Sequence, residues 1–134
     1  MLKRVHHINF VVHDLEVAVR KYQELFGLEN CEYLDHPHRL VKTARFKVGE
    51  TWIILLQPLD SESLPGKHLK QYGEGFFLIS YEVENLGAAM KNIKDKGGTL
   101  LDEQARAGIL NWQVADIDPD STIGTLIQIV EEKN

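Results

Sequence analysis

Three histidines fall within the segment HHINFVVHDL, residues 6–15, in an otherwise apolar run. Histidine has an ordinary pKa close to neutrality, so it serves both as a metal ligand and as a general acid or base. The β-branched and aromatic residues of this run predict a strand over residues 6–12. Side chains alternate along a strand, which places His7 on one face together with Asn9, and His6 on the other.

Each histidine has a functional and a structural interpretation. His7 either lines a binding site, as a ligand contact or proton-transferring group, or is an interior histidine satisfied by its neighbours. For His6 a structural or surface role is favoured, and His13 is expected to be a solvated residue where the strand meets the next helix. The charged run EEKN at residues 131–134 is interpreted as a solvated tail.

Composition narrows the class of protein. The chain has 134 residues, 43% hydrophobic and 26% charged, which fits one globular domain. Its net charge is −5 and its Lys and Arg residues are scattered, so nucleic-acid binding is not expected. No apolar run approaches the roughly 20 residues that span a bilayer, and no signal peptide is recognised. With a single cysteine, Cys31, there is no internal disulfide, and a cytosolic location is predicted.

The order of predicted elements occurs twice. A helix is predicted over residues 13–28, with Asp14 as N-cap and Gly27 as the stop signal. In the second half, Asn85 and Gly97 have the same roles around a helix over residues 84–98. The other expected elements are strands over 40–48, 51–59, 75–83, 99–101, 111–117 and 125–132, and one helical turn within the polar segment 59–74.

A shift of 71 positions aligns the two halves through a strand, a helix cap and a helix, placing Leu78 over His7 and Ser80 over Asn9. A match of this extent predicts an internal repeat. We expect an α+β domain over residues 1–134, made of two pseudo-symmetric βαβββ modules. The modules span about residues 1–60 and 73–134, with a linker at 59–74, and their mixed β-sheet would form a half-closed cup.

The chain resembles the vicinal oxygen chelate superfamily, which has the glyoxalase, bleomycin-resistance and dioxygenase fold. Its methylmalonyl-CoA epimerase-like and glyoxalase-like members are the most similar. The resemblance rests on VHHINFVVHDLEVAVRKYQELFGL, GETWIILLQPLDSES, YGEGFFLISYEVENLGAAMKNIKDKGG and DPDSTIGTLIQIVEE. It covers nearly the whole chain, and the segments 29–40 and 103–111 match poorly. It implies the α+β cup and, because related domains pair, a homodimer.

In metal-binding members, four side chains meet in the cup, and their positions can be carried over one by one. His7 keeps the first ligand position. Ile54 and Leu78 occupy the second and third, and neither side chain has a lone pair to offer. Gln128 occupies the fourth, where relatives carry glutamate. Two neutral ligands facing two aliphatic side chains do not compensate the desolvation of a divalent cation. We therefore expect no metal cofactor at these positions.

The alternative is a divalent metal (Zn, Ni, Co or Mn) at a degenerate or shifted site, for example one that uses His36 or His38. His7 is the candidate catalytic residue. Lys42 stands where the epimerase pattern places an acid, and either holds an anionic ligand or is a solvated strand-edge lysine. The expected lining of the cup is His7, Asn9, Lys42, Ile54, Leu78, Ser80 and Gln128.

Two functions are consistent with this lining. The favoured hypothesis is a metal-free protein that binds a small, partly hydrophobic molecule with a carbonyl group. The alternative is an isomerase, epimerase or lyase of the methylmalonyl-CoA epimerase or lactoylglutathione lyase type, acting next to a carbonyl. In that enzyme His7 would move the proton while Gln128 or Asn9 polarises the oxygen. The partner in both cases is a small molecule, with no nucleic acid and no membrane.

Overall fold

The computed structural model describes residues 1–36 and 40–133, which fall into two compact units. Unit 1 combines Met1–His7 with Leu78–Asn134, and unit 2 is Ile8–Phe77. The strands β1 (Leu2–Val11) and β5 (Gly75–Val83) each contribute residues to both units. The chain passes between the units at these strands.

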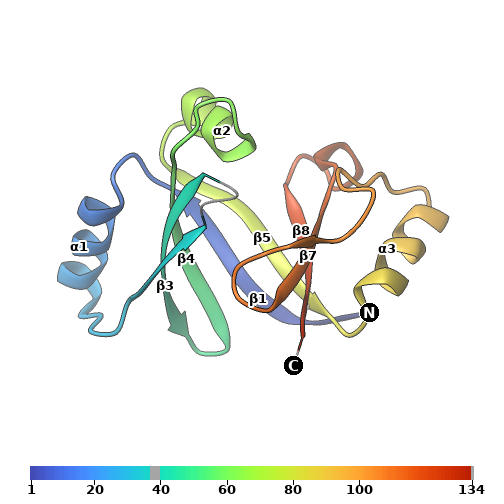
Figure 1. The fold of residues 1–134 in the computed structure, drawn as a ribbon, viewed down its shortest axis with the longest axis horizontal. Helices are drawn as coiled ribbons and strands as arrows, with labels where there is room; N and C mark the ends of the chain where they lie inside the picture. The colour runs from blue at the N-terminus through green and yellow to red at the C-terminus, as the bar shows by residue number, and fades with distance from the viewer. Residues whose placement is uncertain (37–39, 134) are drawn as a thin grey trace. The chain divides into compact units, whose positions relative to one another are not determined.

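Unit 2 is a sheet covered by one helix (Figure 1). Its elements are α1 (Leu15–Phe26), β2 (Glu32–His36), β3 (Val41–Val48), β4 (Thr51–Pro58) and α2 (Leu64–Tyr72). The strand order is β2-β3-β4-β1, with β3 antiparallel to both β2 and β4. Leu15 and Val19 of α1 pack against Ala44, Phe46 and Leu55, and this cluster is the core of the unit.

Unit 1 repeats this architecture (Figure 1). Its elements are β5, α3 (Leu86–Asp95), β6 (Arg106–Ala107), β7 (Trp112–Ile117), the 3-10 turn Pro119–Ser121 and β8 (Ile127–Glu132). The strand order is β1-β5-β8-β7-β6, in which β5 and β8 run parallel and β7 and β8 antiparallel. The mixed sheet and its helices make the chain an α+β protein, as predicted.

The two main helices begin in the same way. Asp14 and Asn85 have nearly identical extended backbone angles, and each side chain accepts a hydrogen bond from the N–H three residues on. A strand of the same unit supplies a second acceptor: Gln57 for the N–H of Leu15, and Glu131 for the N–H of Leu86. Two of the orphan donors at each helix start are thereby satisfied.

Helix α3 packs against one face of the unit 1 sheet, and the opposite face carries polar side chains. Val83, Ala115 and Ile129 pack with Leu86 and Met90 of α3. Because side chains alternate along strands, the neighbours of these strand residues point to the opposite face. That polar face holds Ser80 and Glu82 from β5, Gln128 and Glu132 from β8, and Trp112 and Asp116 from β7.

Several predicted elements differ in extent. β1 starts at Leu2, four residues before the predicted strand, and α2 covers nine residues instead of one turn. β2 and β6 lie in segments where no strand was expected. Residues 99–101 form no strand and contribute a single bridge between Leu100 and Ile117. Strands as short as β2 and β6 have too few residues to show an alternation of apolar and polar side chains. Their strand conformation depends on pairing with a neighbouring strand.

Candidate functional site

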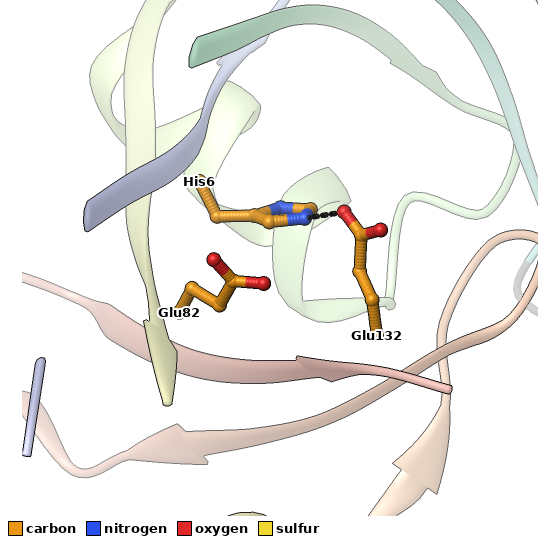
Figure 2. A group of neighbouring side chains, drawn as sticks. All are labelled: His6, Glu82 and Glu132. Carbon is orange, nitrogen blue, oxygen red and sulfur yellow. Dashed lines mark hydrogen bonds and ion pairs between the residues drawn. The ribbon is translucent and has the colours of Figure 1, made fainter. Parts of the chain in front are cut away.

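One cluster of ionisable side chains stands out in unit 1 (Figure 2). His6 is fully buried, and its Nε2 atom is hydrogen-bonded to Oε1 of Glu132. Glu82 reaches the same point from β5. One ligand atom from each of these three residues lies within 4.8 Å of the others, a spacing that could hold a metal ion. The cluster brings together a strand near the N-terminus and the last strand of the chain.

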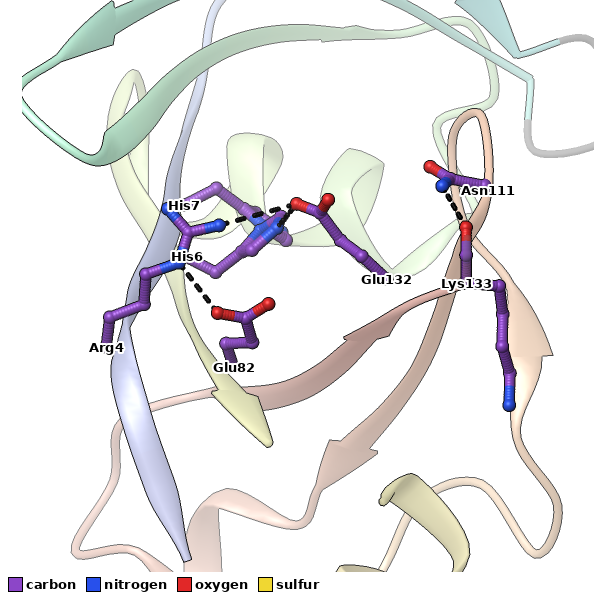
Figure 3. Close-up of polar contacts among 7 residues, drawn as sticks. All are labelled: Arg4, His6, His7, Glu82, Asn111, Glu132 and Lys133. Carbon is purple, nitrogen blue, oxygen red and sulfur yellow. Dashed lines mark hydrogen bonds and ion pairs between the residues drawn. The ribbon is translucent and has the colours of Figure 1, made fainter. Parts of the chain in front are cut away.

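Arg4 already supplies a cation to this cluster (Figure 3). Its Nε atom donates to Oε1 of Glu82 at 2.7 Å, and one of its terminal nitrogens lies 3.5 Å from Oε1 of Glu132. The side chain of Arg4 is 26% exposed, against 14% for Glu82 and 32% for Glu132. The guanidinium therefore bridges both carboxylates at the edge of the buried region, and charge-assisted hydrogen bonds of this kind are strong.

The ionisation of this cluster follows from burial and from Arg4. Desolvation lowers the pKa of His6 below 6.5, because a buried imidazolium loses its hydration, and the hydrogen bond to Glu132 and the charge of Glu132 only partly offset this. Burial alone would raise the pKa of Glu82. The hydrogen bond and charge of Arg4 outweigh that effect, so the pKa of Glu82 lies below its ordinary value. The structure thus favours a neutral His6 beside an ionised Glu82.

His7 joins the same group through His6. The two Nδ1 atoms are 2.8 Å apart, so one ring donates to the other. Trp112 contacts both: the indole is stacked on His7 at 16° between planes, and meets His6 edge-on at 85°. His7 is 3% exposed, and the indole fixes the planes of both imidazoles.

The predicted separation of His6 from His7 is therefore wrong. Alternation along a strand fixes the direction of each Cβ atom, but an imidazole lies beyond Cβ and can turn along the strand toward its neighbour. The interpretation of EEKN as a solvated tail is also wrong for its first two residues: Glu131 caps α3 and Glu132 binds His6. His13 is exposed at the start of the helix, as predicted.

A second polar group crosses the same face of unit 1. Ser80, Gln128 and Asp116 are register partners on β5, β8 and β7, so their side chains form one row. All three are buried, and Gln128 Nε2 donates to Oδ1 of Asp116 at 3.0 Å. The Oγ atom of Ser80 has no hydrogen-bond partner among the described residues. A buried hydroxyl of this kind calls for a ligand or an ordered water.

Arg106 and Asp102 hold Asp116 in place. Arg106 donates to Oδ2 of Asp116 at 3.0 Å and also pairs with Asp102, whose Oδ2 accepts the backbone N–H of Asp116 at 2.7 Å. These contacts fix the carboxylate of Asp116, and through it the amide of Gln128.

Of the remaining predicted site residues, Asn9, Lys42 and Ile54 lie in unit 2, and Leu78 lies in unit 1. Asn9 is buried and its Oδ1 atom has no partner among the described residues, whereas Lys42 is exposed. Ile54 is buried on β4 opposite Arg45, a buried arginine that sequence reasoning overlooked. The guanidinium of Arg45 bonds Glu32 at 3.0 Å and lies 3.8 Å from the ring centroid of Trp52. Leu78, on β5, is also buried.

The two loop histidines of the alternative metal site are His36 and His38. His36 ends β2, and His38 lies outside the described residues. Among the described residues, the group that could hold a metal is His6, Glu82 and Glu132. Glu82 and Glu132 are each four residues beyond a family ligand position, Leu78 and Gln128. Residues an even number of positions apart on a strand have side chains on the same face, so each glutamate shares a face with its ligand position. The sequence could have indicated both glutamates in this way.

Comparison with known proteins decides the family. The model of the Glyoxalase/Bleomycin resistance protein/Dioxygenase superfamily matches residues 6–115. The chain belongs to this superfamily. Methylmalonyl-CoA epimerase, mitochondrial, from Bos taurus is 30% identical over 129 residues, covering 96% of this chain and 74% of that protein.

Solved structures of the superfamily give the same result. A Streptomyces coelicolor methylmalonyl-CoA epimerase variant in complex with 2-nitronate-propionyl-CoA has a TM-score of 0.94 at 27% identity, with 100% of both chains covered. A methylmalonyl-CoA epimerase in complex with methylmalonyl-CoA and NH4+ has a TM-score of 0.92 at 28% identity, covering 98% of this chain and 96% of that one. The predicted glyoxalase fold is thereby confirmed.

Metal chemistry at the superfamily's ligand positions does not fit this chain. Ile54 and Leu78 are buried hydrocarbons, and the amide of Gln128 is engaged by Asp116. In the group of His6, Glu82 and Glu132 the donor atoms suit a divalent cation, but Arg4 already neutralises one of its two negative charges. A metal would enter this group only if the guanidinium moved away.

Proposed function

We propose that this protein binds an acyl-coenzyme A thioester and exchanges the proton on the carbon next to the thioester carbonyl, as an epimerase does. The observation that carries the proposal is the whole-length match to methylmalonyl-CoA epimerases, including structures with 2-nitronate-propionyl-CoA and methylmalonyl-CoA. The proposal reverses the preference drawn from the sequence, where binding without turnover was favoured.

His7 is the group to which we assign proton transfer. It would break the C–H bond by accepting the proton on a ring nitrogen, leaving an enolate, and a proton returned to the other face of that carbon gives the epimer. Negative charge on the enolate oxygen requires a hydrogen-bond donor. The hydroxyl of Ser80 suits this role, because it is buried and has no partner among the described residues. Gln128 is less suited, since an N–H of its amide already serves Asp116.

Proton exchange in heavy water tests this proposal. The protein is incubated with methylmalonyl-CoA in D₂O, and loss of the α-proton signal is followed by NMR, with EDTA in one sample and added Mn²⁺, Co²⁺, Ni²⁺ or Zn²⁺ in others. We expect exchange in the EDTA sample and its loss in His7→Gln. Exchange that persists in His7→Gln at the wild-type rate would overturn the assignment of the base.

A second candidate function is binding of the thioester without turnover. The aliphatic residues Ile54 and Leu78 favour it, since they remove two ligand positions of the metal-binding members. The same samples separate the two functions: a bound thioester whose α-proton does not exchange, with and without metal, identifies a binding protein.

Location and assembly complete the proposal. No helix in the described part of the chain is long and apolar enough to cross a membrane. We propose a cytosolic homodimer made of two pseudo-symmetric modules, on the basis of the repeat, the lone free Cys31 and the family resemblance. Native mass spectrometry of the purified protein would report its oligomeric state and any bound metal together.

A further inference from the structure

Arg45 is a buried cation on the face of the unit 2 sheet that is turned away from α1. Its neighbours on β3, Ala44 and Phe46, pack against that helix, so alternation along the strand directs Arg45 to the opposite face. Only 6% of the residue is exposed. A guanidinium keeps its charge when it is buried, so this charge needs an anionic partner.

The carboxylate of Glu32 is such a partner. Nε and one terminal nitrogen of Arg45 each lie 3.0 Å from the same oxygen, Oε2 of Glu32. The side chain of Glu32 is 57% exposed, against 8% for that of Arg45. The indole of Trp52 packs on the guanidinium, whose Cζ atom is 3.8 Å from the ring centroid, and this contact fixes the guanidinium plane. The pair therefore joins a fixed cation to an anion that can turn into solvent.

Arg45 lies beside a position that the family resemblance marks as functional. Ile54 is its register partner on β4, and the Cβ atoms of such cross-strand partners are about 5 Å apart. Ile54 occupies the second ligand position of the metal-binding members, where this chain offers hydrocarbon in place of a ligand atom. Asn9, whose neighbour Phe10 packs toward α1, lies on the same face of the adjoining strand β1. Its buried Oδ1 atom has no partner among the described residues, so this face combines a fixed positive charge with an unsatisfied polar atom.

We propose that Arg45 determines substrate specificity: its guanidinium binds a free carboxylate on the acyl group of the ligand, and Glu32 is the internal carboxylate that this group displaces. The acyl thioester in this statement rests on the proposed function. The exchange replaces the contact to Glu32 and leaves the other contacts of Arg45 in place. A carboxylate that binds through two oxygens has the advantage over Glu32, whose Oε2 atom alone accepts from both nitrogens.

Calorimetric titration of the full chain in the presence of EDTA tests this preference. The ligands are racemic methylmalonyl-CoA and propionyl-CoA, which share the coenzyme and differ in the free carboxylate. We expect the wild type to bind methylmalonyl-CoA about 10- to 100-fold more tightly, the range that hydrogen bonds to a charged group provide. Equal affinity for the two thioesters, or binding of neither, would overturn the proposal.

Removing the guanidinium should remove the preference. We expect Arg45→Met to bind the two thioesters with similar affinity, and its Kd for propionyl-CoA to equal that of the wild type. An equal loss for both ligands would assign Arg45 to the phosphates of the coenzyme and contradict the proposal. Lys21→Met is the control: it removes an exposed cation from α1, which covers the other face of the sheet, and should keep the wild-type ratio.

Glu32→Gln tests the displacement in a protein that keeps Arg45. A neutral amide holds a guanidinium less strongly than a carboxylate does, so the ligand competes with a weaker partner. We expect the Kd of methylmalonyl-CoA to fall several-fold while the Kd of propionyl-CoA stays the same. Unchanged affinity for methylmalonyl-CoA would show that the ligand does not displace Glu32. This variant decides the question even where Arg45→Met does not fold.

Lys42 is the competing anion partner, because the sequence suggested it for an anionic ligand. It lies three residues before Arg45 on β3, so its side chain points to the opposite face of the sheet. Loss of the preference in Lys42→Met, with Arg45→Met unaffected, would overturn the assignment to Arg45. These measurements are also separate from turnover. If the wild type exchanges no α-proton, the proposed function fails, while the affinity ratio still decides the role of Arg45.

Discussion

The amide nitrogen of Gln128 donates to a carboxylate oxygen of Asp116, its cross-strand partner, at a distance of 3.0 Å. This bond fixes the orientation of the amide: the nitrogen turns toward Asp116, and the oxygen turns away from it. The relationship also explains why glutamine is compatible with this position, where the family resemblance implies glutamate. A carboxylate at position 128 would face the carboxylate of Asp116 inside a buried row.

Replacing Gln128 by glutamate should therefore destabilise the protein. Both groups are about 95% buried, and the new charge would lack a donor and meet a like charge, which typically costs about 3–5 kcal/mol. Urea denaturation of Gln128→Glu against wild type measures the loss. Gln128→Met, which removes the amide without adding charge, is the control and should lose less.

The double variant Gln128→Glu with Asp116→Asn tests the cause. It restores one donor and one acceptor across the pair, and Arg106 keeps Asp102 as a partner. We expect it to recover most of the stability lost in Gln128→Glu. If the double variant is as unstable as the sum of the two single variants, like-charge repulsion is not the reason.

The caps of the two main helices should contribute similarly to stability. Asn85 accepts a hydrogen bond from Ala88 in α3, as Asp14 does from Val17 in α1. Changing Asn85 to Ala, or Asp14 to Ala, should lower the free energy of unfolding by about 1 kcal/mol each. Thermal or urea denaturation checks both values. A loss confined to one variant would show that the second acceptor, Gln57 or Glu131, replaces the cap in the other.

Most helices and strands could be predicted from the sequence because the residues that mark their ends act locally. Asp14, Asn85 and Gly27 mark helix ends by their own side-chain and backbone chemistry, and the structure has caps at all three. β2 was missed because its five residues, Glu32–His36, are stabilised by pairing with β3 and show no period of their own.

The candidate site was less predictable because its partners are distant in sequence. Strand alternation assigned His7 and Ser80 to the cup, and both residues are buried. It could not reveal that Glu132 meets His6 across 126 positions, since that contact depends on the order of strands in unit 1. The family resemblance drew attention to Leu78 and Gln128, while the ionisable groups lie four residues, or about 13 Å, further along the same strands.

Acid should weaken the protein through His6. Its pKa is lowered in the folded state by burial, so between that pKa and 6.5 the unfolded chain holds a proton that the folded chain lacks. Stability is then fully present above pH 6.5 and declines as the pH falls through this window. Urea denaturation from pH 7.5 to 5 should show the decline in wild type and a smaller one in His6→Asn. Equal slopes in both proteins would assign the decline to other groups.

Removing Arg4 should convert its cluster into a metal site. The guanidinium bonds Glu82 at 2.7 Å and lies 3.5 Å from Glu132, so in wild type it competes with any divalent cation for both carboxylates. In Arg4→Met two carboxylates and the imidazole of His6 remain within 4.8 Å of one another, with no cation between them. Calorimetric titration with Mn²⁺ and Zn²⁺ should detect one site in Arg4→Met and none in wild type.

The ligands of that site can be checked in the same background. Adding Glu82→Gln to Arg4→Met removes one anionic donor and should weaken metal binding on the order of tenfold or more. Lys91→Met is the surface control: it removes a cation that pairs with Asp95 in the described part of the chain, and it should create no site. Stoichiometric binding by wild type would mean that Arg4 does not occupy the cluster in solution. A folded Arg4→Met that binds neither ion would mean that these carboxylates do not converge as the structure has them.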